Sequence, residues 1–132
     1  MIKNPKRSIA ILMAMLLCFS CLSLTVSARW AYIATTGDCL KLNAGGRLHC
    51  DGTVEVYSGY TAKVTVEVQR YISGSWETIK SWSDTGPNYA SVCEDWYVSS
   101  GYQYRLKLTN QALSGGVVKE TFIDYSNYVI YD

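Results

Sequence analysis

The feature that most constrains this chain is the strict alternation of apolar and polar residues from Ala62 to Gln69. Successive side chains of a β-strand point to opposite faces, so this alternation predicts a strand with one buried face and one face in water. Residues 102–109 repeat the alternation, with apolar or aromatic residues at the even positions. Both segments need an opposing layer over their inward side chains, which we expect to be Ala62, Val64, Val66, Val68, Tyr102, Tyr104, Leu106 and Leu108.

The rest of the chain after residue 28 shows no sustained helical period, and turn-forming residues divide it into short segments. A three-residue turn at 73–75 joins the first alternating segment to residues 76–83, which we predict to be a strand with a bulge. Residues 84–88 and 114–116 have the composition of loops. The whole pattern predicts an all-β fold, an antiparallel sandwich of two sheets. Further strands are expected at 30–34, 40–42, 47–57, 96–98, 117–123 and 128–131.

The N-terminus has the three parts of a secretion signal. Three basic residues precede an apolar stretch at 9–24, and Val26 and Ala28 offer the small residues that signal peptidase accepts. We therefore predict a signal peptide at 1–28, cleaved after Ala28, and one domain at 29–132 that is secreted, extracellular or associated with the cell surface. Retention as an uncleaved anchor and lipidation of Cys21 are the alternatives.

The charge balance argues against nucleic acid and lipid as partners. The chain has 12 Lys and Arg residues against 11 Asp and Glu residues. Removal of residues 1–28 takes away three basic residues and no acidic one, which leaves a slightly acidic domain. Nucleic acids and anionic membranes attract concentrated positive charge, so we expect no nucleic-acid partner and no membrane insertion after cleavage.

Three of the five cysteines follow the predicted signal, and an oxidising exterior permits a disulfide between two of them. Cys39 and Cys50 flank a segment that we expect to form a hairpin turning at Ala44-Gly45, which would place the two cysteines opposite each other. The predicted disulfide is therefore Cys39–Cys50, with Cys93 unpaired in the interior. Pairing of Cys50 with Cys93 would close a longer loop, and the three possible pairings stay open.

Few residues offer catalytic or metal chemistry. His49 is the only histidine, and its neighbour Cys50 would point to the opposite face of a strand. The chain has no Gly-x-Ser-x-Gly elbow and no His-Glu-x-x-His zinc motif. We therefore predict no catalytic residue, no metal site and no cofactor. A small hydrolase that uses Asp51, Glu94 and Asp95 as paired carboxylates is the alternative from the enzyme class.

Aromatic residues are abundant, with 4 Trp, 11 Tyr and 2 Phe. Some of these rings are expected on solvent-exposed faces, where flat rings form a platform for a sugar or an extended partner. The candidates are Tyr57, Tyr71, Trp76 and Trp82. Ordinary sheet packing explains the same rings if they are buried. The expected function is a secreted, non-enzymatic binding or interaction module for an extracellular protein or glycan. A carbohydrate-binding module that uses these four residues and a self-associating matrix component are alternatives.

Residues 98–106 resemble the late strands of fibronectin type III and other immunoglobulin-like modules. In those modules an apolar residue and a glycine precede a corner tyrosine, and here these residues are Val98, Gly101 and Tyr104. The resemblance covers roughly residues 54–131. It implies an immunoglobulin-like sandwich in which the Tyr104 ring lies in the core and its hydroxyl bonds to upstream backbone. The chain departs from immunoglobulin domains at Leu106, which stands where they carry their second core cysteine.

The layout of nearly the whole chain is also similar to small secreted proteins of Gram-positive bacteria that form a domain family of unknown function. The shared features are the signal peptide, a strand ending at Tyr71, the two tryptophans Trp76 and Trp82, the segment 101–105 and Glu120 downstream. This resemblance implies an extracellular β-domain and supplies no activity.

Overall fold

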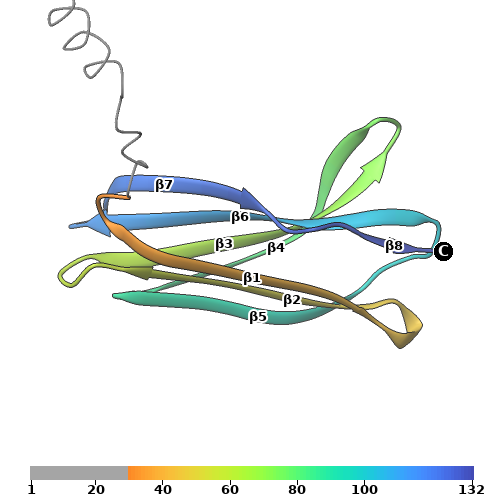
Figure 1. Cartoon of the computed structure of the whole chain (residues 1–132), viewed down its shortest axis with the longest axis horizontal. Helices are drawn as coiled ribbons and strands as arrows, with labels where there is room; N and C mark the ends of the chain where they lie inside the picture. Colours follow the sequence, from red (N-terminus) through yellow and green to blue (C-terminus); the bar gives the residue numbers. More distant parts are fainter. Residues whose placement is uncertain (1–29) are drawn as a thin grey trace, which may run out of the picture.

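The computed structural model describes residues 30–132, and Figure 1 shows them as two layers of strands. The predicted signal peptide at 1–28 and Cys21 within it lie outside the described residues. Between residues 30 and 132, no helix has the length and the apolar character that crossing a membrane requires.

The described residues form eight strands and one short 3₁₀ turn, which is η1 (Ala44–Gly46). The smaller sheet has the strand order β1-β2-β5, and the larger has the order β4-β3-β6-β7 with β8 also paired to β6. All strand pairs are antiparallel. The predicted all-β architecture of two antiparallel sheets is therefore confirmed. The strands are β1 (Ile33–Asn43), β2 (Arg47–Val56), β3 (Thr61–Ile72), β4 (Ser75–Pro87), β5 (Tyr89–Tyr97), β6 (Tyr102–Ser114), β7 (Val117–Tyr125) and β8 (Val129–Tyr131).

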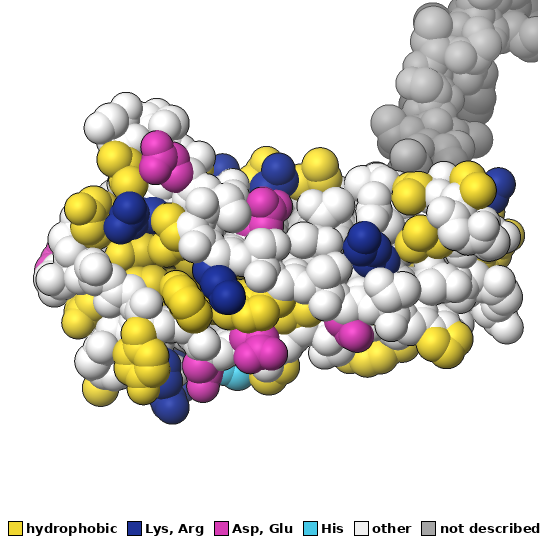
Figure 2. Space-filling model, turned by 180° about the vertical axis from the view of Figure 1, so that it is seen from behind, with side chains coloured by type: hydrophobic (Ala, Val, Ile, Leu, Met, Phe, Trp, Pro, Cys, Tyr) yellow, Lys and Arg dark blue, Asp and Glu magenta, His cyan; other side chains and the backbone are white. Residues whose placement is uncertain are grey.

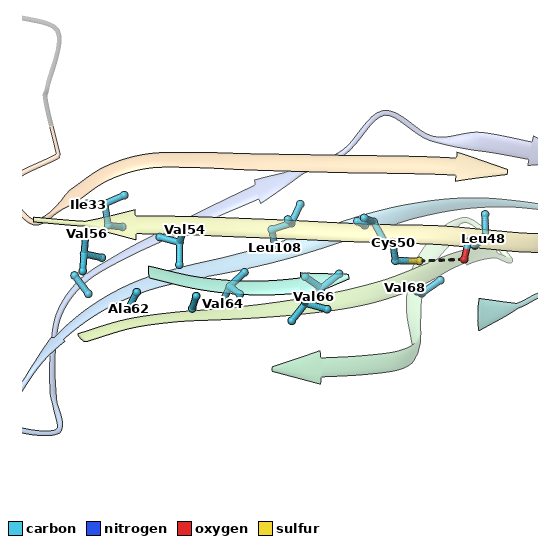
Figure 3. Close-up of a cluster of buried hydrophobic side chains, with 14 of the residues drawn as sticks. Ile33, Leu48, Cys50, Val54, Val56, Ala62, Val64, Val66, Val68 and Leu108 are labelled. Carbon is cyan, nitrogen blue, oxygen red and sulfur yellow. Dashed lines mark hydrogen bonds between the residues drawn. The ribbon is translucent and has the colours of Figure 1, made fainter. Parts of the chain in front are cut away.

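The side chains between the two sheets come from alternate positions of the strands, as the sequence pattern predicts (Figure 3). Each fully buried valine or leucine contributes about 1.5–3 kcal/mol by leaving water, so this layer holds the sheets together. Tyr102 is the exception among the predicted inward residues, because it lies at the start of β6 and is 36% exposed. The buried apolar residues are Ile33, Leu48, Cys50, Val54, Val56, Ala62, Val64, Val66, Val68, Ala90, Val92, Tyr104, Leu106, Leu108 and Ala112.

The segment 84–88 is not the loop that its composition predicts. Strand β4 continues to Pro87, and the chain reverses at Asn88 alone before β5 begins at Tyr89. Asn88 has a φ of 66°, and asparagine tolerates this left-handed conformation better than most residues. The predicted bulge in residues 76–83 is confirmed, because Val68 pairs with Lys80 and Gln69 with Thr78.

The predicted Cys39–Cys50 disulfide is wrong for this structure, in which both cysteines are free. A turn of two residues at Ala44-Gly45 would have paired Cys39 with Cys50. The actual turn has three residues, so Cys39 pairs with Asp51 instead. A shift of one residue reverses the face of every side chain, so Cys39 is exposed and Cys50 is buried.

The third residue of this turn, Gly46, explains why the turn has three residues and not two. Gly46 is buried with a φ of 79°, and a Cβ atom there would lie 2.6 Å from the Val98 carbonyl oxygen and 2.7 Å from the Tyr131 ring. Only glycine fits this close approach. The interior position predicted for Cys93 is also wrong, because Cys93 is exposed and Cys50 takes the interior place.

Candidate functional site

A cluster of thiol, imidazole and carboxylate groups lies on the outer face of the smaller sheet. His49 and Asp51 lie two residues apart on β2, so their side chains share one face. Cys93 and Asp95 have the same spacing on β5, where Cys93 pairs with Asp51 and Asp95 pairs with His49. The antiparallel register therefore brings the four side chains into one square, which we call the thiol–imidazole cluster.

Distances within the thiol–imidazole cluster indicate a defined orientation of the histidine ring. Nδ1 of His49 lies 2.9 Å from Oδ1 of Asp95, and Nε2 lies 4.0 Å from Sγ of Cys93. One ligand atom each from His49, Asp51 and Cys93 lies within 4.8 Å of the others. His49 and Asp51 are partly buried and Cys93 is exposed, so the cluster is open to solvent.

The other two cysteines within residues 30–132, Cys39 and Cys50, lie outside this cluster. Cys39 is on β1, opposite Asp51 and in the same row as Cys93, but β2 separates the two thiols. Two strand spacings are about 9.5 Å, which is beyond the reach of a disulfide. Cys50 faces the core, where burial together with the charge of Asp95 raises the pKa of its thiol to about 12. Cys50 is therefore a packing residue.

A second cluster lies on the outer face of the larger sheet and joins aromatic rings to an arginine. The guanidinium carbon of Arg105 lies 4.4 Å from the centroid of the Trp76 ring and 4.2 Å from that of Tyr125. The rings of Tyr71 and Trp76 lie 5.2 Å apart. We call these four residues the aromatic–arginine patch.

Polar side chains hold Arg105 in this position. Its Nε donates a hydrogen bond of 2.9 Å to Oε1 of Gln69, which is only 7% exposed. Nε2 of Gln69 donates to Oγ1 of Thr78, which in turn donates to Oε1 of Glu67. This hydrogen-bonded chain crosses β6, β3 and β4, so the guanidinium is fixed before any partner binds.

The four residues predicted as an aromatic platform do not share one strip. Tyr71 and Trp76 meet near the β3–β4 turn, and Tyr71 is 41% exposed. Tyr57 is also exposed, but it follows β2 near the other end of β3, about 30 Å away by strand length. Trp82 pairs with Val66 and is turned toward the sandwich interior.

Trp82 on β4 contacts Trp96 on β5, where the edges of the two sheets meet. Its ring lies 6.2 Å from that of Trp96, and Nζ of Lys80 lies 5.5 Å and 4.6 Å from the two ring centroids. The hairpin of β3 and β4 protrudes from the sandwich (Figure 1), and on the half of the molecule that bears it hydrophobic and basic side chains lie side by side (Figure 2). An open hollow of about 430 Å³ lies beside Trp82, with Ser83, Asp84, Ser91, Val92, Cys93 and Glu94 as its other lining residues.

The three carboxylates of the alternative hydrolase are not brought to one site. Asp51 and Asp95 lie on the outer face of the smaller sheet, on neighbouring strands. Glu94 lies between Cys93 and Asp95 on β5, so its side chain points to the other face of that strand. The geometry therefore offers Asp51 and Asp95 to a common ligand and leaves Glu94 out.

Tyr104 anchors the connection that leads into β6. Its ring is fully buried, and its hydroxyl donates a hydrogen bond of 2.5 Å to the backbone oxygen of Ser99. Burial is the largest influence on this hydroxyl and raises its pKa. The tyrosine thus joins the core to the loop before β6.

Sequence reasoning missed the contact between His49 and Cys93 and the role of Arg105. The signal for the first was present, because His-x-Asp and Cys-x-Asp each place two side chains on one face of a strand. Only the register between β2 and β5 joins the two pairs. A comparison with protein-family models finds no matching family, and a comparison with curated proteins finds no match.

Proposed function

We propose that this chain is a secreted, non-enzymatic binding module that recognises a protein partner through the aromatic–arginine patch. The observation that carries the proposal is the position of the Arg105 guanidinium between the rings of Trp76 and Tyr125. Tryptophan, tyrosine and arginine are the residue types that dominate the binding energy of protein interfaces. Their gathering on one solvent-facing sheet favours a recognition role over simple packing.

The fixed position of Arg105 supports recognition because it lowers the entropy cost of binding. An arginine side chain that is free in solution loses rotamer freedom when a partner immobilises it. Here Gln69 and the two rings already hold the guanidinium. The side chain is therefore preorganised, and more of the contact energy is left to stabilise the complex.

The chemistry of the patch indicates an acidic partner segment. Among residues 30–132, ion pairs involve Arg47, His49 and Asp95, and none involves Arg105. The terminal nitrogens of Arg105 are thus available to bind a carboxylate with two parallel hydrogen bonds. Ile123 is two residues from Tyr125 on β7 and is 48% exposed, which adds apolar area. We expect a partner with an aspartate or glutamate beside apolar side chains.

A glycan is the less favoured ligand of this patch. A sugar ring stacks on the free face of an aromatic ring. The Trp76 ring has Arg105 over one side and is in contact with Tyr71. Tyr71 and Tyr125 keep more exposed area, so a carbohydrate-binding module that uses these tyrosines is the second candidate.

An immunoglobulin-like sandwich is part of the same proposal. In immunoglobulin domains the second and fifth of the seven strands pair in one sheet, and the third and sixth pair in the other. The β2–β5 and β3–β6 pairs of this chain support that arrangement, as does the buried Tyr104 bonded to Ser99. Tyr104→Phe tests the tyrosine corner. We expect a loss of about 1 kcal/mol in the free energy of unfolding, and an unchanged value would remove this support.

Selection from a random peptide library displayed on phage tests the binding role. We expect the purified protein to enrich peptides that carry Asp or Glu beside apolar residues. Affinity for a selected peptide should fall at least tenfold in Arg105→Gln and in Trp76→Ala, because each removes part of the patch. The matched control is Arg47→Gln, since Arg47 is an exposed arginine on the other sheet.

Other outcomes would contradict the proposal in distinct ways. Equal loss of peptide affinity in Arg47→Gln and Arg105→Gln would indicate non-specific charge attraction. Binding to a glycan array that is lost in Tyr71→Ala and Tyr125→Ala would favour the carbohydrate module. Turnover of glycans or peptides by the pure protein would refute the non-enzymatic role, and its loss in Asp51→Asn would favour the hydrolase alternative.

A further inference from the structure

We propose that His49, Asp51 and Cys93 form a zinc-binding site on the outer face of the smaller sheet, with Asp95 as the residue that orients His49. This site lies on a different sheet from the aromatic–arginine patch. The zinc site is therefore independent of the proposed peptide recognition, and each can fail without the other.

The geometry of the three side chains suits tetrahedral coordination. Zinc bonds thiolate sulfur at about 2.3 Å and imidazole nitrogen at about 2.0–2.1 Å, so the sulfur and nitrogen of one site lie about 3.6 Å apart. Sγ of Cys93 and Nε2 of His49 are separated by 4.0 Å. Small side-chain rotations close a gap of that size, and one ligand atom each from His49, Asp51 and Cys93 lies within 4.8 Å of the others.

The ligand chemistry selects zinc among the common divalent ions. Calcium and magnesium prefer sites built from oxygen atoms alone. A thiolate, an imidazole and a carboxylate together form a mixed set that suits the borderline-soft zinc ion. The thiolate and the carboxylate also supply two negative charges, which balance the charge of the ion.

Asp95 gives the imidazole the orientation that a metal ligand needs. Histidine ligands commonly donate the second ring N–H to a carboxylate, which fixes the ring and strengthens the metal bond. Asp95 accepts this hydrogen bond from Nδ1 at 2.9 Å and leaves Nε2 directed toward Cys93. Figure 2 shows the histidine side chain at the lower margin of the molecule beside acidic side chains.

Two basic residues lie near the cluster and would oppose a cation. Lys41 pairs with His49 from β1 and is exposed, so water screens its charge. Arg47 lies 3.9 Å from Oδ2 of Asp95, on the carboxylate oxygen that does not contact His49. The charge of Arg47 is thus partly balanced by Asp95.

Three protein ligands leave the fourth position of a tetrahedral zinc ion open. The site is on an exposed sheet face, so water or a side chain from another molecule can complete it. This arrangement predicts moderate affinity and a role in metal-dependent contact at the outer face of β2 and β5.

Metal titration of the purified protein, kept reduced, tests the site. We expect one zinc ion per chain by competition with a chromophoric chelator. Cobalt should give the thiolate-to-metal charge-transfer absorption that reports a cysteine ligand. Cys93→Ser and His49→Ala should each weaken zinc binding at least a hundredfold, and Asp95→Asn should weaken it about 10- to 100-fold.

The matched control is Cys39→Ser, because Cys39 is an exposed thiol in the same row but outside the cluster. It should leave the zinc affinity and the cobalt spectrum unchanged. Zinc should raise the Tm of the unsubstituted protein and of Cys39→Ser but not that of Cys93→Ser, because a ligand that binds only the folded state stabilises it. Absence of the thiolate band, or an equal loss in Cys39→Ser and Cys93→Ser, would overturn the proposal.

Discussion

The two faces of β2 place neighbouring residues in opposite environments. Leu48 and Cys50 point into the core and are fully buried, whereas His49 and Asp51 point outward into the thiol–imidazole cluster. The inward residues are fixed by packing against the larger sheet. The outward residues contact polar side chains of β5 and solvent instead of the core, so their substitution leaves the packing between the sheets intact. The comparison teaches that the even positions 48 and 50 of this strand stabilise the fold, whereas the odd positions 49 and 51 form the candidate site.

The largest expected difference between the faces is in thiol reactivity. In the folded protein, iodoacetamide should modify Cys39 and Cys93 at least about a thousandfold faster than Cys50, because reaction at Cys50 requires opening of the core. The raised pKa of Cys50, about 12, adds to this protection. Mass spectrometry of timed samples measures the three rates. Denaturant should make them similar, and fast modification of Cys50 without denaturant would contradict the comparison.

Truncation of neighbouring residues on β2 should affect the free energy of unfolding very differently on its two faces. Leu48→Ala leaves a cavity in the core and should lower the free energy of unfolding by about 2–5 kcal/mol. His49→Ala, one residue along the same strand, should change it by no more than about 0.5 kcal/mol in the absence of metal. Urea unfolding followed by tryptophan fluorescence measures both values, and similar losses in the two variants would contradict the division.

Enlargement of the inward face should have the next largest effect. A Cβ atom at Gly52 would lie 2.5 Å from a methyl carbon of Val66 and 2.8 Å from one of Leu108. Gly52→Ala should therefore lower the free energy of unfolding by about 1–3 kcal/mol through overpacking. Asp51→Ala on the outward face is the control, with an expected change within about 0.5 kcal/mol. If Gly52→Ala unfolded at the same urea concentration as the unsubstituted protein, the core would accommodate the extra methyl group without loss of stability, which would contradict this prediction.

The smallest expected effect concerns Glu120, a carboxylate with a structural role. Burial would raise its pKa, but hydrogen bonds from the backbone N–H groups of Ile33, Ala31 and Tyr32 outweigh burial and lower it. The charged form thus stabilises the fold at pH values above the ordinary glutamate pKa, and this contribution is lost as the pH falls through the lowered value.

The test of Glu120 compares the unsubstituted protein with Glu120→Gln across pH. The difference in free energy of unfolding should be largest at neutral pH and vanish in acid, where both side chains are neutral. Its size should be less than that of Gly52→Ala. A Glu120→Gln difference that grows in acid would show that the sign of the pKa shift is wrong.

The sequence was sufficient to predict the sheets because burial of alternate residues leaves a strong pattern. Val64, Val66 and Val68 could be placed inward without knowledge of their partners. Register was harder, because it depends on the conformation of a single turn. The sequence pattern predicts a turn of two residues, whereas Gly46 is a third turn residue, and this difference of one position places Cys39 on the outer face.

The candidate sites depend on neighbours that only the folded chain reveals. His49 and Cys93 are 44 residues apart, and their contact follows from the pairing of β2 with β5. Arg105 has the alternation of an ordinary outward residue, and nothing in its local sequence indicates that Trp76 and Tyr125 enclose it. Local sequence indicates which residues form strands. These clusters depend on which strands pair and in which register, and local sequence does not indicate that.

The bonds to Glu120 also have a consequence for the order of assembly. The carboxylate that receives the backbone N–H groups at the start of β1 lies 87–89 residues later in the chain. Because a chain is synthesised from its N-terminus, these hydrogen bonds cannot form until β7 has been made. The start of β1 therefore pairs with β2 early, but its outer backbone N–H groups gain this carboxylate only after most of the domain has been made.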